Sequence, residues 1–464
     1  MSNYDVIVIG AGPGGYVAAI RAAQLGLKTA IVDKQWLGGV CLNVGCIPSK
    51  SLLKNAEVAH LLRERGKEFG FSFENLALDF GVAVKRSRQV SDRLTKGVGF
   101  LMRKNEIDVH MGEARLVSAN KVEVAMDDEV KTLTGDNLIV ATGASVAVPS
   151  VWTIDGEKVV TYLEAILQET RPERVVIIGA GAIGVEFATI WNGYGSEVTV
   201  VEMLDRIIPN EDEEVSSELS KAFAKRGINC LPGHRVEQLE TTDNGVEVTI
   251  SKGEETQVVE VDQVLVATGF KANTGALGLE DLGVELDDQG AVVIDDRMAT
   301  NVAGIWAIGD VTGKLMLAHV ASAQGIICAE NIAGVESYTL DYKMMPRATY
   351  SHPQVASFGY TEAEAAEMGY EVKVGRFPFQ ANGKALGLGD YAGWVKLVTD
   401  AKYGEILGAH MVGPEVTELL PELTIAQMME LTAAEIARNV HAHPSLSETL
   451  MEMAHAASGH SIHI

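Results

Sequence analysis

The sequence predicts an α/β protein that contains two Rossmann-like dinucleotide-binding domains. Residues 4–34 and 173–203 share one layout, in which an apolar strand, a glycine-rich turn and a helix of small residues lead to a second strand that ends on an acid. Glycine-rich turns also arise for packing reasons alone. Here strand, turn, helix and acid agree twice, so a dinucleotide at each unit is the favoured interpretation.

The first unit carries Gly10, Gly12 and Gly15 in its turn, with Asp33 lying 23 residues after Gly10. In such turns the first glycine permits the tight bend and the second lets the backbone approach a pyrophosphate. The third lets the helix pack close to the strand, while the acid accepts hydrogen bonds from ribose hydroxyls. We therefore expect a dinucleotide at this unit.

The second unit repeats the pattern with Gly179, Gly181 and Gly184, and Glu202 again lies 23 residues after the first glycine. A carboxylate at this position repels a 2′-phosphate, and no arginine between it and Arg206 is available to receive one. The second unit is therefore predicted to prefer NAD over NADP.

The duplication continues beyond each unit. Residues 138–144 read LIVATGA and residues 264–270 read VLVATGF, so each unit is followed by an apolar strand that runs into a turn of small residues. Each unit therefore has the extent of a complete domain. Thr142 and Gly143 are predicted to contact the first dinucleotide, and Gly269 the second.

The charge of the chain excludes some partners. There are 38 Lys and Arg against 63 Asp and Glu, a formal charge of −25, which argues against binding to nucleic acid or to anionic lipid. The uncharged run 137–154 is interrupted by Asn137, Gly143 and Pro149 and predicts a strand and loops rather than a membrane span. The N-terminus has no basic segment or cleavage site, so a cytoplasmic location is expected.

Cysteines are few, and two of the four stand together. Cys41 and Cys46 lie in GGVCLNVGCIPSK (38–50), whereas Cys230 and Cys328 are isolated and are expected to be buried packing residues. No second cysteine pair or HxxxH pattern is present to complete a metal site, so none is expected. A disulfide between cysteines this close would close a small, sterically constrained ring that can open and reform. This favours a redox-active disulfide over the alternative, two reduced cysteines packed near the start of a helix.

The cysteine segment, together with AIGDVTGKLMLAH (307–319) and HAHPSLSE (441–448), resembles the pyridine nucleotide disulfide oxidoreductases, and the resemblance covers essentially the whole chain. It implies an FAD-binding domain with the redox disulfide (1–145), an NAD-binding domain (146–272), a central domain that returns to the FAD (273–342) and a C-terminal α+β dimerisation domain (343–464). The protein is then expected to be a homodimer.

The same resemblance implies roles for single residues. Cys46 would lie against the flavin and pass electrons to it, while Cys41 would exchange with the substrate thiol. Lys50 would lie by the flavin and pair with Glu186. Further FAD contacts carry over to Ala114, Asp310, Met316, Leu317, Ala318 and His319, and a further NAD contact to Val236.

Oxidising a dithiol releases protons, so the chemistry needs a base with a pKa near neutrality, and histidine is the natural candidate. His443 precedes Pro444, and Glu448 lies five residues further on, where it can orient the ring. The resemblance makes His443 the base and Glu448 its partner, acting on the disulfide of the opposite subunit. His441 is read as structural, and His352 lacks an acid five residues later.

Within the family, the cysteine segment is most similar to that of members that oxidise dihydrolipoyl groups. The predicted substrate is a lipoyl group on a partner protein, either from a 2-oxoacid dehydrogenase complex or from the glycine cleavage system, with NADH as product. One alternative is a glutathione or mercuric reductase, which Glu202 and the lack of any cysteine after Cys328 argue against. Another is a non-catalytic flavoprotein subunit, which would turn over slowly even with free dihydrolipoamide.

Overall fold

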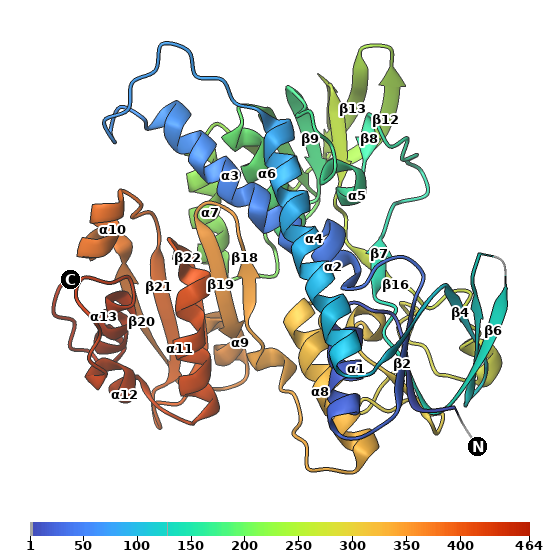
Figure 1. Ribbon diagram of the computed structural model, residues 1–464. Helices are drawn as coiled ribbons and strands as arrows, with labels where there is room; N and C mark the ends of the chain where they lie inside the picture. Colours follow the sequence, from blue (N-terminus) through green and yellow to red (C-terminus); the bar gives the residue numbers. More distant parts are fainter. Residues whose placement is uncertain (1–2, 128) are drawn as a thin grey trace.

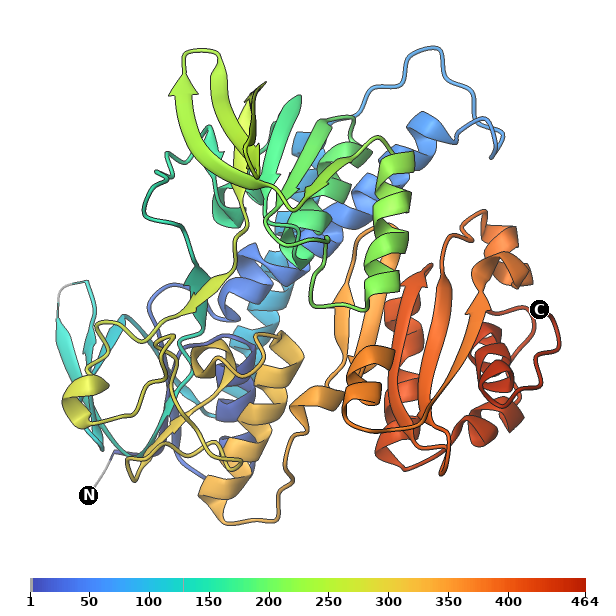
Figure 2. The same cartoon turned by 180° about the vertical axis from the view of Figure 1, so that it is seen from behind.

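The computed structural model describes residues 3–127 and 129–464, so the first two residues of the predicted FAD-binding domain, and residue 128 within it, lie outside the described residues. Two α/β regions built on parallel strands lie on one side of the molecule, and an antiparallel sheet with its own helices lies on the other (Figures 1 and 2). Among the described residues, no helix is both long enough and apolar enough to cross a bilayer.

The first sheet has the order β3-β2-β1-β6-β5-β4, and β17 pairs with the free side of β6. Strands β1, β2, β3, β6 and β17 run parallel, and β4 and β5 are antiparallel. Buried valines and isoleucines fill β1, as expected for a strand covered on both faces. The strands are β1 (Tyr4–Ile9), β2 (Thr29–Asp33), β3 (Asp108–Met111), β4 (Glu113–Ser118), β5 (Lys121–Ala125), β6 (Val130–Val140) and β17 (Ile305–Ala307).

Helices α1 (Pro13–Gln24) and α8 (Ala318–Ala333) lie side by side against this sheet (Figure 1). Their backbones approach closely, because a Cβ atom added at Gly325 would lie 2.6 Å from the carbonyl oxygen of Gly14. The approach brings the start of α8 next to the first glycine turn, although the two are about 300 residues apart in sequence.

The second sheet is wholly parallel, in the order β11-β10-β9-β15-β8. A three-stranded antiparallel sheet, β12-β13-β14, lies beside it, and the short pair β7-β16 connects the two α/β regions. The strands are β7 (Ala144–Val146), β8 (Val159–Val160), β9 (Arg174–Ile178), β10 (Glu197–Glu202), β11 (Asn229–Pro232), β12 (Arg235–Thr242), β13 (Gly245–Lys252), β14 (Glu255–Val261), β15 (Gln263–Val266) and β16 (Phe270–Ala272), with helices α5 (Tyr162–Ala165), α6 (Ala182–Gly193) and α7 (Glu213–Lys225).

Residues 273–342 return to the first α/β region. They hold β17, α8 and the short 3-10 helices η1 (Glu280–Leu282) and η2 (Gly309–Thr312), while η3 (Tyr342–Met344) lies at their end. Buried side chains such as Leu277, Ile305 and Ile327 belong to the same core as Val6 and Ile31. This segment therefore packs as an extension of the first region, and the boundaries between domains stay predictions.

The C-terminal part is a five-stranded antiparallel sheet in the order β18-β19-β22-β21-β20, with its own core. Helix α11 packs on β19 and β22, and α13 packs on β20 and β21. The elements are β18 (Arg347–Thr349), β19 (Gln354–Gly359), β20 (Val372–Pro378), β21 (Trp394–Asp400), β22 (Ile406–Gly413), α9 (Glu362–Glu367), η4 (Phe379–Ala381), α10 (Gly383–Leu388), α11 (Val416–Met428), α12 (Ala433–Arg438) and α13 (Glu448–Ala457).

Three helices, α2 (Gly39–Val44), α3 (Cys46–Glu64) and α4 (Phe80–Lys104), lie between these parts. Helix α3 packs against both α4 and α6, and a Cβ atom added at Gly193 would lie 2.7 Å from the carbonyl oxygen of Ala56. The helix that begins at Cys46 is therefore held between the first and second α/β regions.

Candidate active site

The cysteine pair lies at the junction of two helices. Cys41 is on α2 and Cys46 is the first residue of α3, and both are half-buried thiols in this structure. Gly39 anchors the segment, because a Cβ atom added there would lie 2.6 Å from the Cα atom of Gly12. The amide of Gly38 also donates a 2.8 Å hydrogen bond to the carbonyl of Ala11. The pair is therefore seated beside the first glycine turn.

The two sulfurs are not equivalent. A hydrogen bond from the Cys41 thiol lowers the pKa of Cys46, and the Lys50 ammonium lowers it further against the opposing effect of burial. The same hydrogen bond, together with burial, raises the pKa of Cys41. The lowered pKa makes Cys46 the thiolate of the pair, and thiolate is the form that reacts.

This inequality predicts that two substitutions of Cys41 change the pKa of Cys46 to different extents. Cys41→Ala removes the hydrogen-bond donor, so the Cys46 thiolate should be lost at a higher pH than in Cys41→Ser, which keeps a hydroxyl donor. Because the pKa of Cys46 lies below its ordinary value, thiolate persists as the pH falls until that lowered pKa is reached. The rate of alkylation by iodoacetamide, measured against pH, follows the thiolate. Identical profiles for the two variants would contradict the donor role of Cys41.

Lys50 is held by a contact between three separate segments. Its ammonium lies 2.9 Å from Glu186 on α6 and 4.6 Å from the ring centre of Tyr350, and the Tyr350 amide donates to the same carboxylate at 3.0 Å. Burial alone would lower the pKa of Lys50, but the charge and the hydrogen bond of Glu186, together with the charges of Cys46 and Tyr350, outweigh it and the pKa is raised. Lys50 therefore stays cationic beside Cys46. Sequence reasoning missed Tyr350, which no motif distinguishes.

The glycine turns leave space where a dinucleotide would need it. Cβ atoms added at Gly12 and Gly181 would meet no atom within 4 Å. At Gly15 and Gly184 an added Cβ would instead lie 1.9 Å from the carbonyl oxygen of the first glycine of the same turn. The second glycine of each turn thus faces open space that a pyrophosphate fits, and the third is required by packing.

The two strand-terminal acids do more than the sequence indicates. Asp33 accepts a 2.7 Å hydrogen bond from the amide of Ala11, and Glu202 accepts one of 2.8 Å from Ala180. Each acid therefore ties the end of its second strand to its glycine turn. A carboxylate has about four acceptor positions. Asp33 also accepts hydrogen bonds from the amides of Gln35 and Trp36, and Glu202 from the amide of Leu204, so about one position on Asp33 and two on Glu202 remain for ribose hydroxyls.

Asp310 is a half-buried carboxylate at the start of η2, and among the described residues no hydrogen-bond partner of its side chain is found. Burial raises its pKa to about 6. Burial raises the pKa of Tyr162 to about 12, and the charge of Asp310 adds to that shift. An acceptor without a donor fits the hydroxyl groups of a flavin side chain.

The remaining residues predicted to bind cofactors fall at loop ends and strands. Thr142 donates a 2.8 Å hydrogen bond to the carbonyl of Asn273. Gly143 and Gly269 have φ of 70° and 115° and face open space. Ala114 on β4 and Val236 on β12 are buried. Met316 and Leu317 precede α8, which begins at Ala318, and His319 contacts the carbonyl of Pro346 at 2.8 Å.

His443 lies in the loop between α12 and α13. Its Nδ1 is 2.9 Å from Glu448, whose other oxygen accepts a hydrogen bond from the Ser445 amide. Partial burial would raise the pKa of Glu448, but these contacts outweigh it and lower the pKa. The His443 ring is 80% exposed, and α13 lies across the C-terminal sheet from α2 (Figures 1 and 2). A single chain therefore does not bring His443 to its own cysteine pair.

Two other histidines occupy fixed positions. His441 is buried, with one ring nitrogen 2.9 Å from the Asn439 carbonyl and the other 2.8 Å from Glu422. His352 lies 3.8 Å from Asp390, and burial lowers its pKa. Both placements agree with structural roles.

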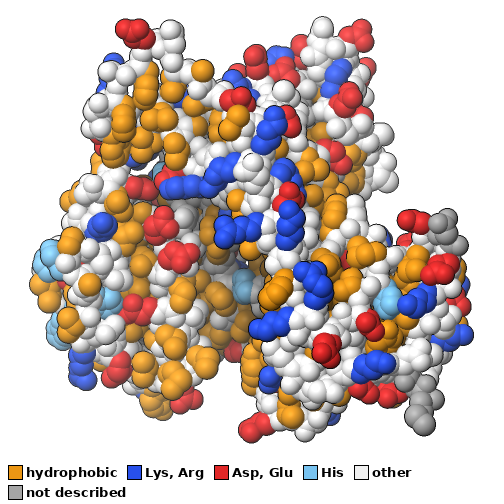
Figure 3. Space-filling model, viewed as in Figure 1, with side chains coloured by type: hydrophobic (Ala, Val, Ile, Leu, Met, Phe, Trp, Pro, Cys, Tyr) orange, Lys and Arg blue, Asp and Glu red, His pale blue; other side chains and the backbone are white. Residues whose placement is uncertain are grey.

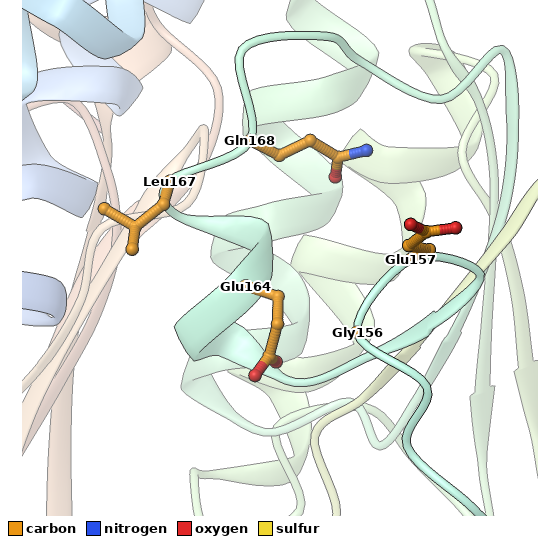
Figure 4. Close-up of a pocket in the computed structure, with 5 residues that line it drawn as sticks. All are labelled: Gly156, Glu157, Glu164, Leu167 and Gln168. Atoms are coloured by element: carbon orange, nitrogen blue, oxygen red, sulfur yellow. The ribbon is translucent and has the colours of Figure 1, made fainter.

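A cavity of about 400 Å³ lies apart from all of these residues, near α5. Figure 4 shows Gln168 and Glu157 facing it and Leu167 pointing away from them. Glu164 is already used there, because its carboxylate accepts hydrogen bonds from the amide and hydroxyl of Thr161. The cavity contains no predicted site residue.

Comparison with known proteins covers nearly the whole chain. Residues 4–325 match the family described as pyridine nucleotide-disulphide oxidoreductase, and residues 345–454 match the dimerisation domain of that family. The chain is 53% identical to the dihydrolipoyl dehydrogenase of Mycobacterium leprae, over all of both chains. It is 52% identical to that of Corynebacterium glutamicum over 99% of each chain, and 41% identical to that of Bacillus subtilis over 100% of this chain and 99% of the relative.

Solved structures of two other proteins have the same fold. LpdA from Mycobacterium tuberculosis superimposes with a TM-score of 0.90 at 26% identity, covering 97% of this chain and 98% of that one. A flavoprotein disulfide reductase, RclA from Escherichia coli, superimposes with a TM-score of 0.88 at 26% identity over 98% and 99%. These matches confirm the predicted α/β class, with its two Rossmann-like sheets and a C-terminal dimerisation domain, and imply the use of FAD and NAD(P). The chain therefore belongs to the pyridine nucleotide-disulphide oxidoreductase family.

Proposed function

We propose that this protein is a dihydrolipoyl dehydrogenase, which oxidises dihydrolipoyl groups carried by partner proteins and reduces NAD to NADH. The cysteine pair carries the proposal, because Cys41 and Cys46 meet beside the first glycine turn, one helical turn from the Lys50–Glu186 ion pair. Full-length identity of 52–53% to proteins named dihydrolipoyl dehydrogenase supports this choice of substrate. Glutathione and mercuric reductase remain alternatives that Glu202 and the cysteine positions disfavour.

In the proposed reaction the two cysteines begin as a disulfide. One substrate thiolate attacks Cys41, which forms a mixed disulfide and releases Cys46 as a thiolate that Lys50 stabilises. His443 takes the proton of the second substrate thiol, whose sulfur then displaces Cys41 and closes the substrate disulfide. The two electrons of the substrate now reside in the Cys41–Cys46 dithiol.

Residues of the first α/β region would hold FAD. The groups assigned to it are the turn at Gly12, the strand end at Asp33, the carboxylate of Asp310 and the start of α8. Bound FAD supplies the transfer of the two electrons, as hydride, to NAD at the second glycine turn. The Lys50–Glu186 ion pair would keep the positive charge of Lys50 beside the Cys46 thiolate.

We further propose that the active site is shared between two subunits. The dimerisation domain covers residues 345–454 and includes Glu448 and His443, and the His443 ring faces solvent in the single chain. Val440, three residues before His443, is 91% exposed, as expected for an apolar residue at an interface. His443 of one subunit would then serve the cysteine pair of the other. The lipoyl-bearing partners and a cytoplasmic location belong to the same proposal.

A direct assay tests the function. Purified holoenzyme mixed with dihydrolipoamide and NAD is expected to form NADH at 340 nm, one for each dihydrolipoamide oxidised. Glutathione with NADP, and mercuric ion with NADPH, serve as the matched alternative assays. A protein that binds flavin but responds only to one of these alternatives, or turns over none of the substrates, is not a dihydrolipoyl dehydrogenase.

The cofactor choice can be tested at one residue. Glu202→Gln keeps the size of the side chain and removes the charge that repels a 2′-phosphate. We expect the ratio of kcat/KM for NAD to that for NADP to fall by about tenfold or more, because a charged contact of this kind contributes about 1.5–3 kcal/mol. Glu197→Gln, an exposed position on the same strand, is the control. If this ratio of kcat/KM values does not change in Glu202→Gln, residues other than Glu202 determine the preference for NAD.

A further inference from the structure

Helix α4 carries a charge opposite to that of the protein as a whole. Its 25 residues contain seven Lys and Arg and a single acid, in a chain where acids exceed cations by 25. Figure 3 shows Lys and Arg side chains gathered along the band of surface that α4 occupies in Figure 1. The cations of the helix are Lys85, Arg86, Arg88, Arg93, Lys96, Arg103 and Lys104, and the acid is Asp92.

The cations at the start of α4 are used within the fold. Lys85 lies 3.5 Å from Glu169, and Arg86 donates to the hydroxyl of Ser51 and to Asn55. Arg88 donates to the carbonyl of Asn43. Internal contacts therefore account for the first half of the helix.

The second half is different. Arg93, Lys96, Arg103 and Lys104 are exposed, and within residues 3–127 and 129–464 no carboxylate lies within ion-pair distance of any of them. Arg93, Lys96, Phe100 and Arg103 are spaced by three and four residues, so they share one side of the helix. Phe100 is 56% exposed in their midst. We name Arg93, Lys96, Phe100, Arg103 and Lys104 the α4 cationic face; it extends over about 16 Å.

Helix α4 also contacts, through a different side, the helix that carries the exchanging cysteine. Helix α4 packs on α2, where the hydroxyl of Thr95 lies 3.3 Å from Asn43, two residues after Cys41. Asn43 in turn donates to the carbonyls of Leu37 and Gly39. A partner docked on the α4 cationic face would therefore lie one helix away from the cysteine segment, and a dithiol on a flexible tether would cover that separation.

We propose that the α4 cationic face docks the acidic surface of the protein domain that carries the dihydrolipoyl group. The proposal rests on the proposed function and adds the means by which the carrier is recognised. Four unpaired cations around one exposed aromatic ring fit a partner with carboxylates around an apolar contact. Nucleic acid is disfavoured by the charge of −25, and a second copy of this chain is disfavoured because the dimerisation match begins at residue 345.

The test compares two substrates that differ in the carrier alone. The variant Arg93→Gln/Lys96→Gln/Arg103→Gln/Lys104→Gln is assayed with neutral free dihydrolipoamide and with a purified acidic lipoyl domain bearing the same dithiol, at low and at high salt. Exposed cations on β6, α7, β13 and the turn after β21 supply a control of equal charge change, Lys131→Gln/Lys225→Gln/Lys252→Gln/Lys402→Gln.

The expected result is a loss of about tenfold in kcat/KM for the lipoyl domain at low salt, with most of its salt dependence removed and activity on free dihydrolipoamide unchanged. The control variant should behave as the wild type. Equal losses on both substrates, unchanged use of the lipoyl domain, or elution of the variant as a monomer would each overturn the proposal. Failure of the wild type to oxidise either substrate would instead overturn the proposed function.

Discussion

Cys41→Ser is expected to abolish the oxidation of dihydrolipoamide by NAD, with a fall in kcat of about 10⁴-fold or more. Serine cannot form a disulfide, so the substrate dithiol has no sulfur to attack and its electrons have no route into the protein. Cys46 and Lys50 remain in place, so the half of the chemistry that involves NADH should survive. Steady-state NADH formation measures the loss.

Two further measurements show whether the loss in Cys41→Ser comes from the missing sulfur of Cys41. NADH oxidation with ferricyanide, which accepts electrons without the disulfide, should continue in Cys41→Ser. Cys230→Ser is the matched control, because Cys230 is a half-buried thiol outside the pair whose pKa is raised by burial to about 12. If Cys41→Ser keeps more than about one hundredth of the wild-type rate with dihydrolipoamide, Cys41 is not the sulfur that exchanges with the substrate.

His443→Gln is expected to lower kcat with dihydrolipoamide by about 10²–10⁴-fold, the range typical for loss of a general base. The amide cannot take the proton of the second substrate thiol, although it can still reach Glu448. Glu448→Gln should have a smaller effect, since Glu448 orients the ring and touches no reacting atom. His460→Gln, an exposed histidine near the C-terminus, is the control.

A mixture of the two inactive variants tests whether the site is shared. In a dimer of one Cys41→Ser chain and one His443→Gln chain, a shared arrangement leaves one of the two sites with both residues intact. Random reassociation should therefore restore about one quarter of wild-type activity. If base and cysteine pair belonged to the same chain, both sites would be defective and no activity would return.

Sequence reasoning correctly brought residues together where they are close along the chain. The glycine turns, the strand-terminal acids Asp33 and Glu202 and the pair Cys41–Cys46 lie within short segments, and local backbone geometry alone brings their parts together. The contact between Lys50 and Glu186 joins positions 136 residues apart, and it was predicted only through resemblance to a family. Tyr350, which completes that contact, has no local signature and was missed.

The α4 cationic face could be predicted from the sequence only in part. The excess of cations in residues 80–104 can be read from the sequence, but their use cannot, because that depends on which neighbours the fold supplies. The fold pairs Lys85 with Glu169 and leaves Arg93, Lys96 and their neighbours in solvent. Only the folded chain separates structural cations from those free to meet a partner.

The sequence by itself determined the α/β class, the two dinucleotide units and the redox pair, because strand and helix periods, glycine turns and the reach between nearby cysteines are local properties. Tertiary structure decided the difference between the two sulfurs and the separation of His443 from the cysteine pair of its own chain. A pKa depends on burial and on charges brought close by folding, and such neighbours as Lys50 and Glu186 come from distant segments.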